Sequence, residues 1–118
     1  MTLIKIKRVY DPQEEDDGYR MLVDRLWPRG LKKEMAGVDH WAKEVAPSSD
    51  LRKWFDHEPQ KWQVFQLRYE DELKENKQVD DLIDLIRKNK TVTLLYAAHD
   101  NEHTHAIVLQ RFLQRKVK

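Results

Sequence analysis

Cysteine is absent from the 118 residues, and glycine occurs only at Gly18, Gly30 and Gly37. The absence of cysteine excludes disulfide bonds, thiolate chemistry and cysteine-ligated zinc, and it suits a cytoplasmic protein. So few glycines leave no phosphate-binding glycine loop. The sequence therefore carries no cofactor signature, and we expect no cofactor.

Long apolar runs are also missing. The longest apolar-rich stretch, Val92 to Ala98, is far too short to span a bilayer. Met1 to Arg8 alternates aliphatic with basic residues and lacks the apolar core of a signal peptide, so we expect a cytoplasmic location and no membrane partner. Neither a Gly-x-Ser-x-Gly elbow nor a His-Glu-x-x-His pair occurs, so no motif indicates a reaction. Whether the protein is an enzyme stays open.

The balance of charge limits the partners. The chain has 22 Lys and Arg against 21 Asp and Glu, for a net charge of +1. Such a balance lacks the bulk field of a general nucleic-acid binder, so anion binding must come from local clustering. The length and the 40% share of apolar residues favour one folded domain over residues 1–118. The pattern gives no oligomeric state.

Three segments are expected to form strands. Leu3 to Tyr10 alternates aliphatic with basic residues, Tyr19 to Asp24 contains a short apolar run, and Thr91 to Ala98 is continuously apolar. The last of these is typical of a central strand covered on both faces. Val38 to Val45 fits a helix or a strand, with a slight preference for the strand. The acid-rich segment from Asp11 to Gly18 is expected to be a solvated loop.

Helices are expected between and after these strands. The first spans 51–55 and follows the N-cap residues Ser48 and Ser49. The second begins at Pro59 and turns an apolar face inward, made of Trp62, Phe65, Tyr69 and Leu73. The third and fourth span 79–88 and 106–117. Alternating strands and helices predict an α/β fold, with a small, mostly parallel sheet of about four strands flanked by helices. Ligands of such sheets bind beyond the carboxyl ends of the strands.

The segment from Asp24 to Gly30 follows a predicted inner strand. Arg25 and Arg29, beside a turn stiffened by Pro28, could clamp a phosphate or a carboxylate, and Trp27 could stack on a base. In the alternative interpretation, Arg25 pairs with an acid such as Asp24, and Trp27 packs in the core. The sequence leaves both interpretations open.

A second group of polar residues lies between the central strand and the last helix. His105 at the helix start suits a hydrogen bond or a proton transfer, because the helix dipole favours a neutral imidazole there. It is the candidate catalytic residue. His99 and His103 are weak candidates for metal ligands, but their spacing fits no standard metal motif, so we expect no metal.

A third group combines Arg52 with aromatic residues. Phe55 and Trp62 are expected in the core, where aromatic side chains are usually buried. His57 stands at a helix junction, where a hydrogen-bonded turn is the favoured role and a general base is the alternative.

Several strings resemble the YeaO-like branch of the domain-of-unknown-function 488 family. They are Arg8-Val9-Tyr10-Asp11, Asp17-Gly18-Tyr19-Arg20, Leu22-Val23-Asp24-Arg25-Leu26-Trp27-Pro28-Arg29-Gly30, Ala46-Pro47-Ser48, Leu51-Arg52, Thr93-Leu94-Leu95-Tyr96 and His105-Ala106. The resemblance covers essentially the whole chain and implies a small bacterial cytosolic α/β domain, but no reaction. The usual family pattern before the last helix is Asn-His-Ala, and Thr104 replaces that Asn. A more distant branch has Cys-His-Arg there, and its thiol chemistry does not transfer to a chain without cysteine.

The leading hypothesis is a binding site for a small anionic ligand, such as a nucleotide or another phosphorylated metabolite. The turns around Trp27 and His105 would converge on one positively charged hollow. The candidate ligand-binding residues are Arg8, Asp24, Arg25, Trp27, Arg29, Arg52 and His105. The alternative is a non-enzymatic module that binds protein or nucleic acid, suggested by the many Arg, Lys and Trp residues. The balanced charge weighs against unspecific binding of nucleic acid.

Overall fold

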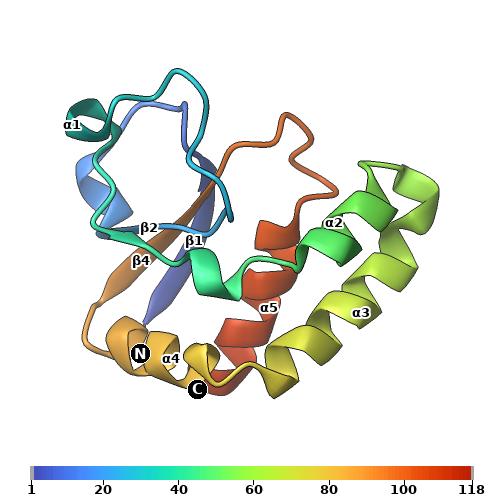
Figure 1. Cartoon of the computed structure of the whole chain (residues 1–118). Coiled ribbons are helices and arrows are strands. Elements are labelled where there is room, and N and C mark those ends of the chain that lie inside the picture. The colour runs from blue at the N-terminus through green and yellow to red at the C-terminus, as the bar shows by residue number, and fades with distance from the viewer. Residues whose placement is uncertain (1, 118) are drawn as a thin grey trace.

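A four-stranded parallel sheet organises the computed structural model, which describes residues 2–117 (Figure 1). The strands are β1 (Leu3–Arg8), β2 (Tyr19–Leu22), β3 (His40–Trp41) and β4 (Thr91–Tyr96). Their order across the sheet is β1-β4-β2-β3, and every pairing between neighbours is parallel. The expected α/β class and the parallel sheet are confirmed.

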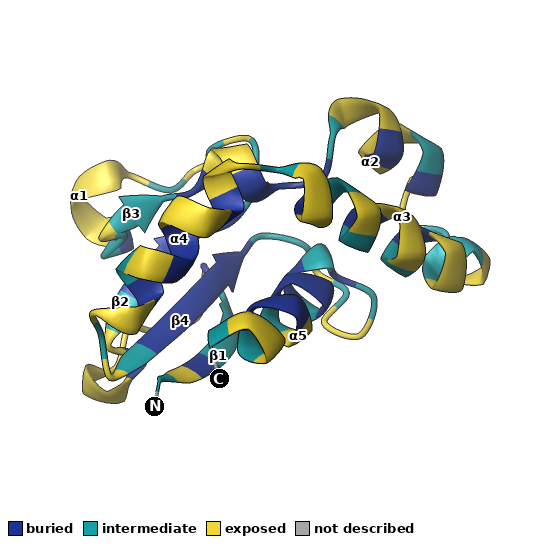
Figure 2. Ribbon diagram, turned by 90° about the horizontal axis from the view of Figure 1, so that it is seen from below, coloured by how far each residue is buried: buried dark blue, intermediate teal, exposed yellow. Residues whose placement is uncertain are grey.

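Strand β4 lies at the centre of the fold, as its continuous apolar run predicted. Val92, Thr93, Leu94 and Leu95 have no exposed surface, and Figure 2 shows β4 in dark blue over nearly its whole length. It pairs with β1 on one side and β2 on the other. Of the ambiguous segment 38–45, only two residues form a strand, and a short 3-10 turn follows at 43–45.

Four helices cover one face of the sheet. The helices of the chain are α1 (Lys33–Ala36), α2 (Ser49–Phe55), α3 (Trp62–Glu75), α4 (Gln78–Arg87) and α5 (His105–Val117). The buried side chains of α2 to α5 form one apolar cluster with Ile4, Met21 and Leu94 of the sheet. The four expected helices are thus present, within one or two residues of their predicted bounds except where a 3-10 turn at 59–61 precedes α3. No helix within residues 2–117 has the length and apolar content needed to cross a bilayer.

Irregular chain, together with the single turn of α1, covers the opposite face. There Val9, Leu22 and Leu95 form a second, smaller apolar cluster, against which Trp27 and Trp41 pack. The sequence predicted helices flanking the sheet, but the long helices lie on the other face (Figure 1). Apolar side chains of the irregular segment, such as Trp27 and Trp41, cover the second face of the sheet. Burial of β4 on both faces therefore does not require a helix on each face.

A closed ionic network lies where the chain enters β2, in the segment expected to be a solvated loop. Asp17 is only 1% exposed. Its Oδ1 accepts from the Lys7 ammonium at 2.8 Å, and its Oδ2 accepts from the Arg20 guanidinium and from the Glu14 N–H at 3.1 Å. Burial raises the pKa of Asp17, but the hydrogen bonds from Lys7, Glu14 and Arg20 together outweigh it, so the pKa lies below its usual value.

Arg20 ties this network to the loop on the second face. It is 1% exposed, and besides the bond to Asp17 its Nε–H donates to the carbonyl of Gly37 at 2.8 Å and its Nη2 donates to the carbonyl of Ala36 at 3.2 Å. Each buried polar group here therefore has a partner, which is the condition under which burying charge is tolerated.

Candidate functional site

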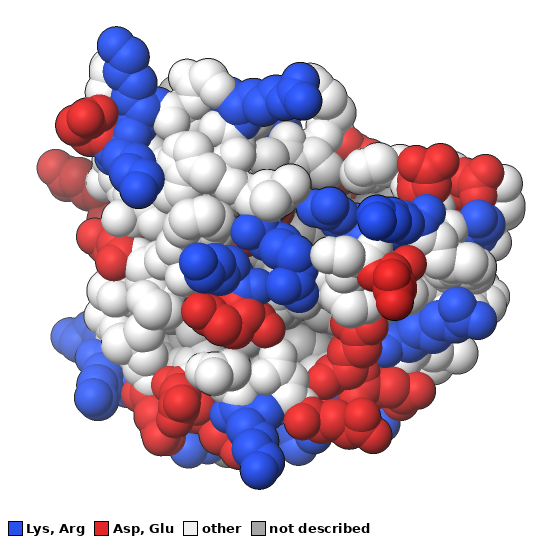
Figure 3. All heavy atoms as spheres, in the orientation of Figure 1, with Lys and Arg blue, Asp and Glu red and all other residues white. Residues whose placement is uncertain are grey.

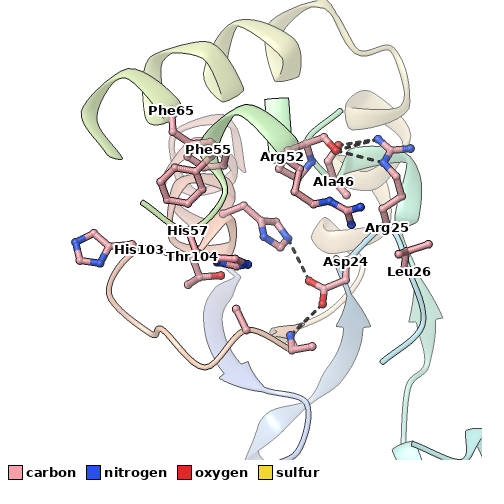
Figure 4. A pocket seen from close by; sticks show the side chains of 14 residues that line it. Asp24, Arg25, Leu26, Ala46, Arg52, Phe55, His57, Phe65, His103 and Thr104 are labelled. Atoms are coloured by element: carbon pink, nitrogen blue, oxygen red, sulfur yellow. Dashed lines mark hydrogen bonds and ion pairs between the residues drawn. The ribbon is translucent and has the colours of Figure 1, made fainter. Parts of the chain in front are cut away.

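A pocket of about 270 Å³ lies at the carboxyl ends of β2 and β4 (Figure 4). Because these parallel strands are neighbours, the turns that follow them meet at one edge of the sheet. The end of α2 and the segment that enters α5 complete the walls. The lining residues are Asp24, Arg25, Leu26, Ala46, Pro47, Arg52, Phe55, His57, Phe65, Ala97, Ala98, His103, Thr104 and His105.

Asp24 links the two strand ends but leaves one of its oxygens without a hydrogen bond. Its Oδ2 accepts from the N–H of Ala97 at 3.0 Å. Its Oδ1 is buried and, among the described residues, has no hydrogen-bond partner, although His105 Nε2 lies 3.3 Å away. Burial raises the pKa of Asp24, opposed by His105, by the Ala97 N–H and by Arg52.

His105 is the first residue of α5, and its orientation is fixed. Its Nε2 lies 2.9 Å from the carbonyl oxygen of Val23. Because a carbonyl can only accept, Nε2 must carry a proton and donate it. Burial lowers the pKa of His105, and the negative charge of Asp24 works in the opposite direction.

The two arginines of the pocket differ in what they bind. Arg25 turns its guanidinium away from Asp24 and donates to the carbonyls of Ala46 at 3.2 Å and Pro47 at 3.1 and 3.2 Å. Arg52 reaches over the pocket, and within residues 2–117 no carboxylate lies within 4.0 Å of it (Figure 4). Arg25 therefore shapes the wall, while Arg52 presents a free cation.

A well-capped helix holds Arg52 in place. Ser48 accepts the Leu51 N–H at 3.1 Å, which confirms the expected N-cap of this helix. The Ser48 hydroxyl donates in turn to Glu72 of α3 at 2.6 Å. The start of α2 is thus anchored to its neighbouring helix, which fixes the backbone from which the exposed Arg52 side chain extends one turn later.

His57 joins the pocket through an unusual backbone. Asp56 and His57 have φ angles of 47° and 54°, in the left-handed region that few residues other than glycine adopt. The turn brings the His57 ring to the pocket wall beside Phe55, at 6.2 Å between ring centroids. Sequence reasoning placed His57 in a helix junction but not in the site, because no local pattern shows that two consecutive non-glycine residues take this conformation.

Thr104 and His103 complete the wall next to α5. Thr104 is 2% exposed, and its hydroxyl accepts the N–H of Ala106 at 3.4 Å at the start of the helix. His103 pairs with Asp100 at 2.8 Å and lies edge-on to Trp62. Thr104 was noted only as a departure from a family pattern, and that departure was the available signal for its place in the site.

Three of the candidate ligand-binding residues do not line the pocket. Arg8 donates to the carbonyls of Ala98 at 2.9 Å and Ala97 at 3.1 Å, so it supports the wall from outside. Trp27 packs edge-on against Trp41 in the second apolar cluster. Arg29 is exposed at the surface. Asp24, Arg25, Arg52 and His105 are the candidates that the fold brings together.

The histidines of the α5 entry do not gather as a metal site. His99 is exposed and lies outside the pocket lining, and His103 is engaged by Asp100. Within residues 2–117, the potential metal-ligand group is instead Glu14, Asp16 and Asp17. These acids lie near the opposite ends of the strands, where Lys and Arg side chains already pair with them.

Charges of both signs share the surface, as the composition predicts. On the face seen in Figure 3, basic side chains gather across the middle, with many acidic side chains below them. The local excess of positive charge in the pocket is therefore a feature of particular residues and does not reflect the net charge of +1.

Comparisons with known proteins agree with the sequence resemblance. A family model described as the inactive DUF488-N3 subclade matches residues 3–118. The chain is similar to the uncharacterised protein YeaO of Escherichia coli K12, with 46% identity over 111 residues that cover 94% of this chain and 96% of that protein. It is also similar to the uncharacterised protein Rv3073c of Mycobacterium tuberculosis, with 38% identity over 112 residues, or 95% and 94% of the two chains. No solved structure gives a significant match.

Proposed function

Because the chain belongs to the DUF488 family, in the subclade described as inactive, we propose that it binds a small anionic ligand in this pocket without converting it. The ligand class is a nucleotide or another phosphorylated metabolite. The relatives extend over the same length and are themselves uncharacterised, so the support for this proposal is the pocket.

One observation carries the proposal, namely the unequal charge of the pocket wall. Among the lining residues within 2–117, two guanidinium groups stand against a single carboxylate, that of Asp24. The guanidinium of Arg25 bonds to carbonyl groups and not to an acid, and among the described residues Arg52 has no ion-pair partner. A guanidinium that is not matched by an acid attracts phosphate or carboxylate, which it can bind through two N–H groups.

The rest of the wall suits an anion that carries an apolar body. Leu26, Ala46, Pro47, Phe55 and Phe65 contribute apolar surface beside the charged groups. Small-molecule sites commonly combine such a wall with a few polar groups that fix the orientation of the ligand. A volume of about 270 Å³ limits the ligand to the size of a small metabolite.

Isothermal titration with inorganic phosphate and with AMP tests the proposal. We expect AMP to bind, and Arg52→Gln to weaken its affinity about tenfold, because a charged hydrogen bond contributes roughly 1.5 kcal/mol or more. Arg29→Gln is the matched control: it removes an exposed arginine of the turn after β2 that does not line the pocket, so it should leave the affinity unchanged. Absence of binding of both probes, or equal weakening by the two variants, would contradict the proposal.

A further inference from the structure

The neutral form of His105 presents the wrong atom to an anion. Its Nε2–H is used by the carbonyl of Val23, so in the neutral ring Nδ1 carries a lone pair. Nδ1 has no hydrogen-bond partner within residues 2–117, and it is not sealed off from solvent. It is therefore the ring atom left to solvent or to a ligand. A lone pair repels an anion, so direct contact requires a second proton on the ring.

Asp24 is placed to stabilise that second proton. Its Oδ1, which has no hydrogen-bond partner among the described residues, lies 3.3 Å from Nε2. A buried carboxylate oxygen without a donor is costly, and a neighbouring positive charge reduces that cost. Protonation of the ring at Nδ1 would thus give the carboxylate a cationic neighbour without any change in the bond to Val23.

We propose that His105 contacts the anion through Nδ1–H, and that each anion bound at this pocket brings one proton from water onto His105. The inference rests on the proposed function, since it concerns the same ligand site. No bond between heavy atoms forms or breaks; the proton moves from solvent to Nδ1, and the charge of Asp24 balances the imidazolium that results.

The other groups that face the ring explain why the anion is needed. Burial is the largest effect that lowers the pKa of His105, and the charges of Arg52 from α2 and His57 from the turn after it lower it further. The ring of Tyr69 from α3 packs edge-on at 6.1 Å, and His103 lines the pocket two residues before His105. Together these effects favour the neutral form of the ring when no anion is beside it. An anion beside Arg52 offsets the repulsion and allows the ring to be protonated.

Sulfate is the suitable probe, because its charge stays constant where histidine titrates. We expect the Kd for sulfate, measured from about pH 5 to about pH 8, to rise with pH and to approach a tenfold increase per pH unit in the steepest part. His105→Gln should bind sulfate more weakly and with a nearly flat profile. His99→Gln is the matched control, since it removes an exposed histidine that does not line the pocket and should leave both the affinity and the slope in place.

A second measurement uses the unaltered protein, in case His105→Gln does not fold. The NMR titration of the His105 ring should show a higher pKa with saturating sulfate than without it, since binding and protonation are linked reciprocally. A pH-independent Kd, a slope that persists in His105→Gln, or a pKa that does not rise with sulfate would overturn the inference while leaving anion binding intact. Failure of sulfate to bind at any pH would also overturn it, and the proposed function would fall with it only if phosphate and AMP failed as well.

Discussion

Two aspartates, Asp17 buried and Asp24 partly buried, lie at opposite ends of the same sheet and have opposite environments. Asp17, before β2, has every carboxylate oxygen paired, through Lys7, Arg20 and the Glu14 N–H. Asp24, after β2, has one oxygen bound to Ala97 and one with no hydrogen bond among the described residues. The pKa of the first is lowered in spite of burial, and the pKa of the second is raised by it.

The contrast separates a carboxylate that is fully engaged within the fold from one that the proposed function assigns to the ligand site. At the Asp17 end, burial is matched by two cations and a backbone donor, so nothing is left for a ligand. At the Asp24 end, the described residues leave three groups without a partner: Arg52 has no ion pair, and neither His105 Nδ1 nor Asp24 Oδ1 has a hydrogen bond. Perturbed and unsatisfied groups of this kind occur more often at functional sites than in structural networks.

Among the substitutions at these two aspartates, Asp17→Asn should lower the free energy of unfolding most. The substitution keeps the shape of the side chain but leaves the 1% exposed Arg20 without its counter-charge. Removing one partner of a buried ion pair commonly costs about 3–5 kcal/mol. Urea unfolding followed by circular dichroism measures the loss.

Asp16→Asn is the control for that substitution. Asp16 is a neighbouring acid that is exposed and forms a surface pair with Lys5, so its loss should cost less than about 1 kcal/mol. If the two variants unfold at the same urea concentration, the network at Asp17 contributes no more than a surface pair.

Lowering the pH should reduce the difference in unfolding free energy between wild type and Asp17→Asn. The pKa of Asp17 in the folded protein is lower than its ordinary value of 3.8, so its stabilisation is present above that pH and is lost as the pH falls through the folded pKa. We expect the difference in unfolding free energy to be fully present at about pH 7 and smaller at about pH 3. A difference that stays constant over this range would show that the stabilisation does not depend on the ionisation of Asp17.

Asp24→Asn should have the smallest effect on stability. The asparagine oxygen can still accept from Ala97, while the charge that burial disfavours is removed. We expect the free energy of unfolding at neutral pH to change by less than about 1 kcal/mol, in either direction. A loss as large as that of Asp17→Asn, in the same urea measurement, would place both aspartates among the structural residues.

Much of the fold could be read from patterns in the chain. The apolar run of β4, the alternation of β1 and the spacing of Phe65, Tyr69 and Leu73 on α3 each reflect local periodicity, which survives without knowledge of the neighbours. Burial of Asp17 was not foreseen, because a cluster of acids indicates a solvated loop unless the cations that approach it from β1 and β2 are known.

The site was predicted in part, and the limit has a physical cause. Asp24 and His105 meet because the ends of parallel neighbouring strands share an edge, a rule that applies before any coordinates exist. Trp27 and Arg29 are close to Asp24 in sequence but leave the pocket, since the turn after Arg25 is directed by the packing of Trp27 on Trp41. That contact joins distant segments, so local residue types do not indicate it.

The left-handed backbone of Asp56 and His57 has a consequence for anyone who engineers this protein for heat resistance. Non-glycine residues in that conformation cost of order 1–3 kcal/mol each, so glycine at either position is an obvious stabilising substitution. At position 57 the same substitution would delete an imidazole from the pocket wall. A selection for survival on heating alone would therefore favour a change that removes a side chain from the pocket wall, and a stability assay would not detect that loss.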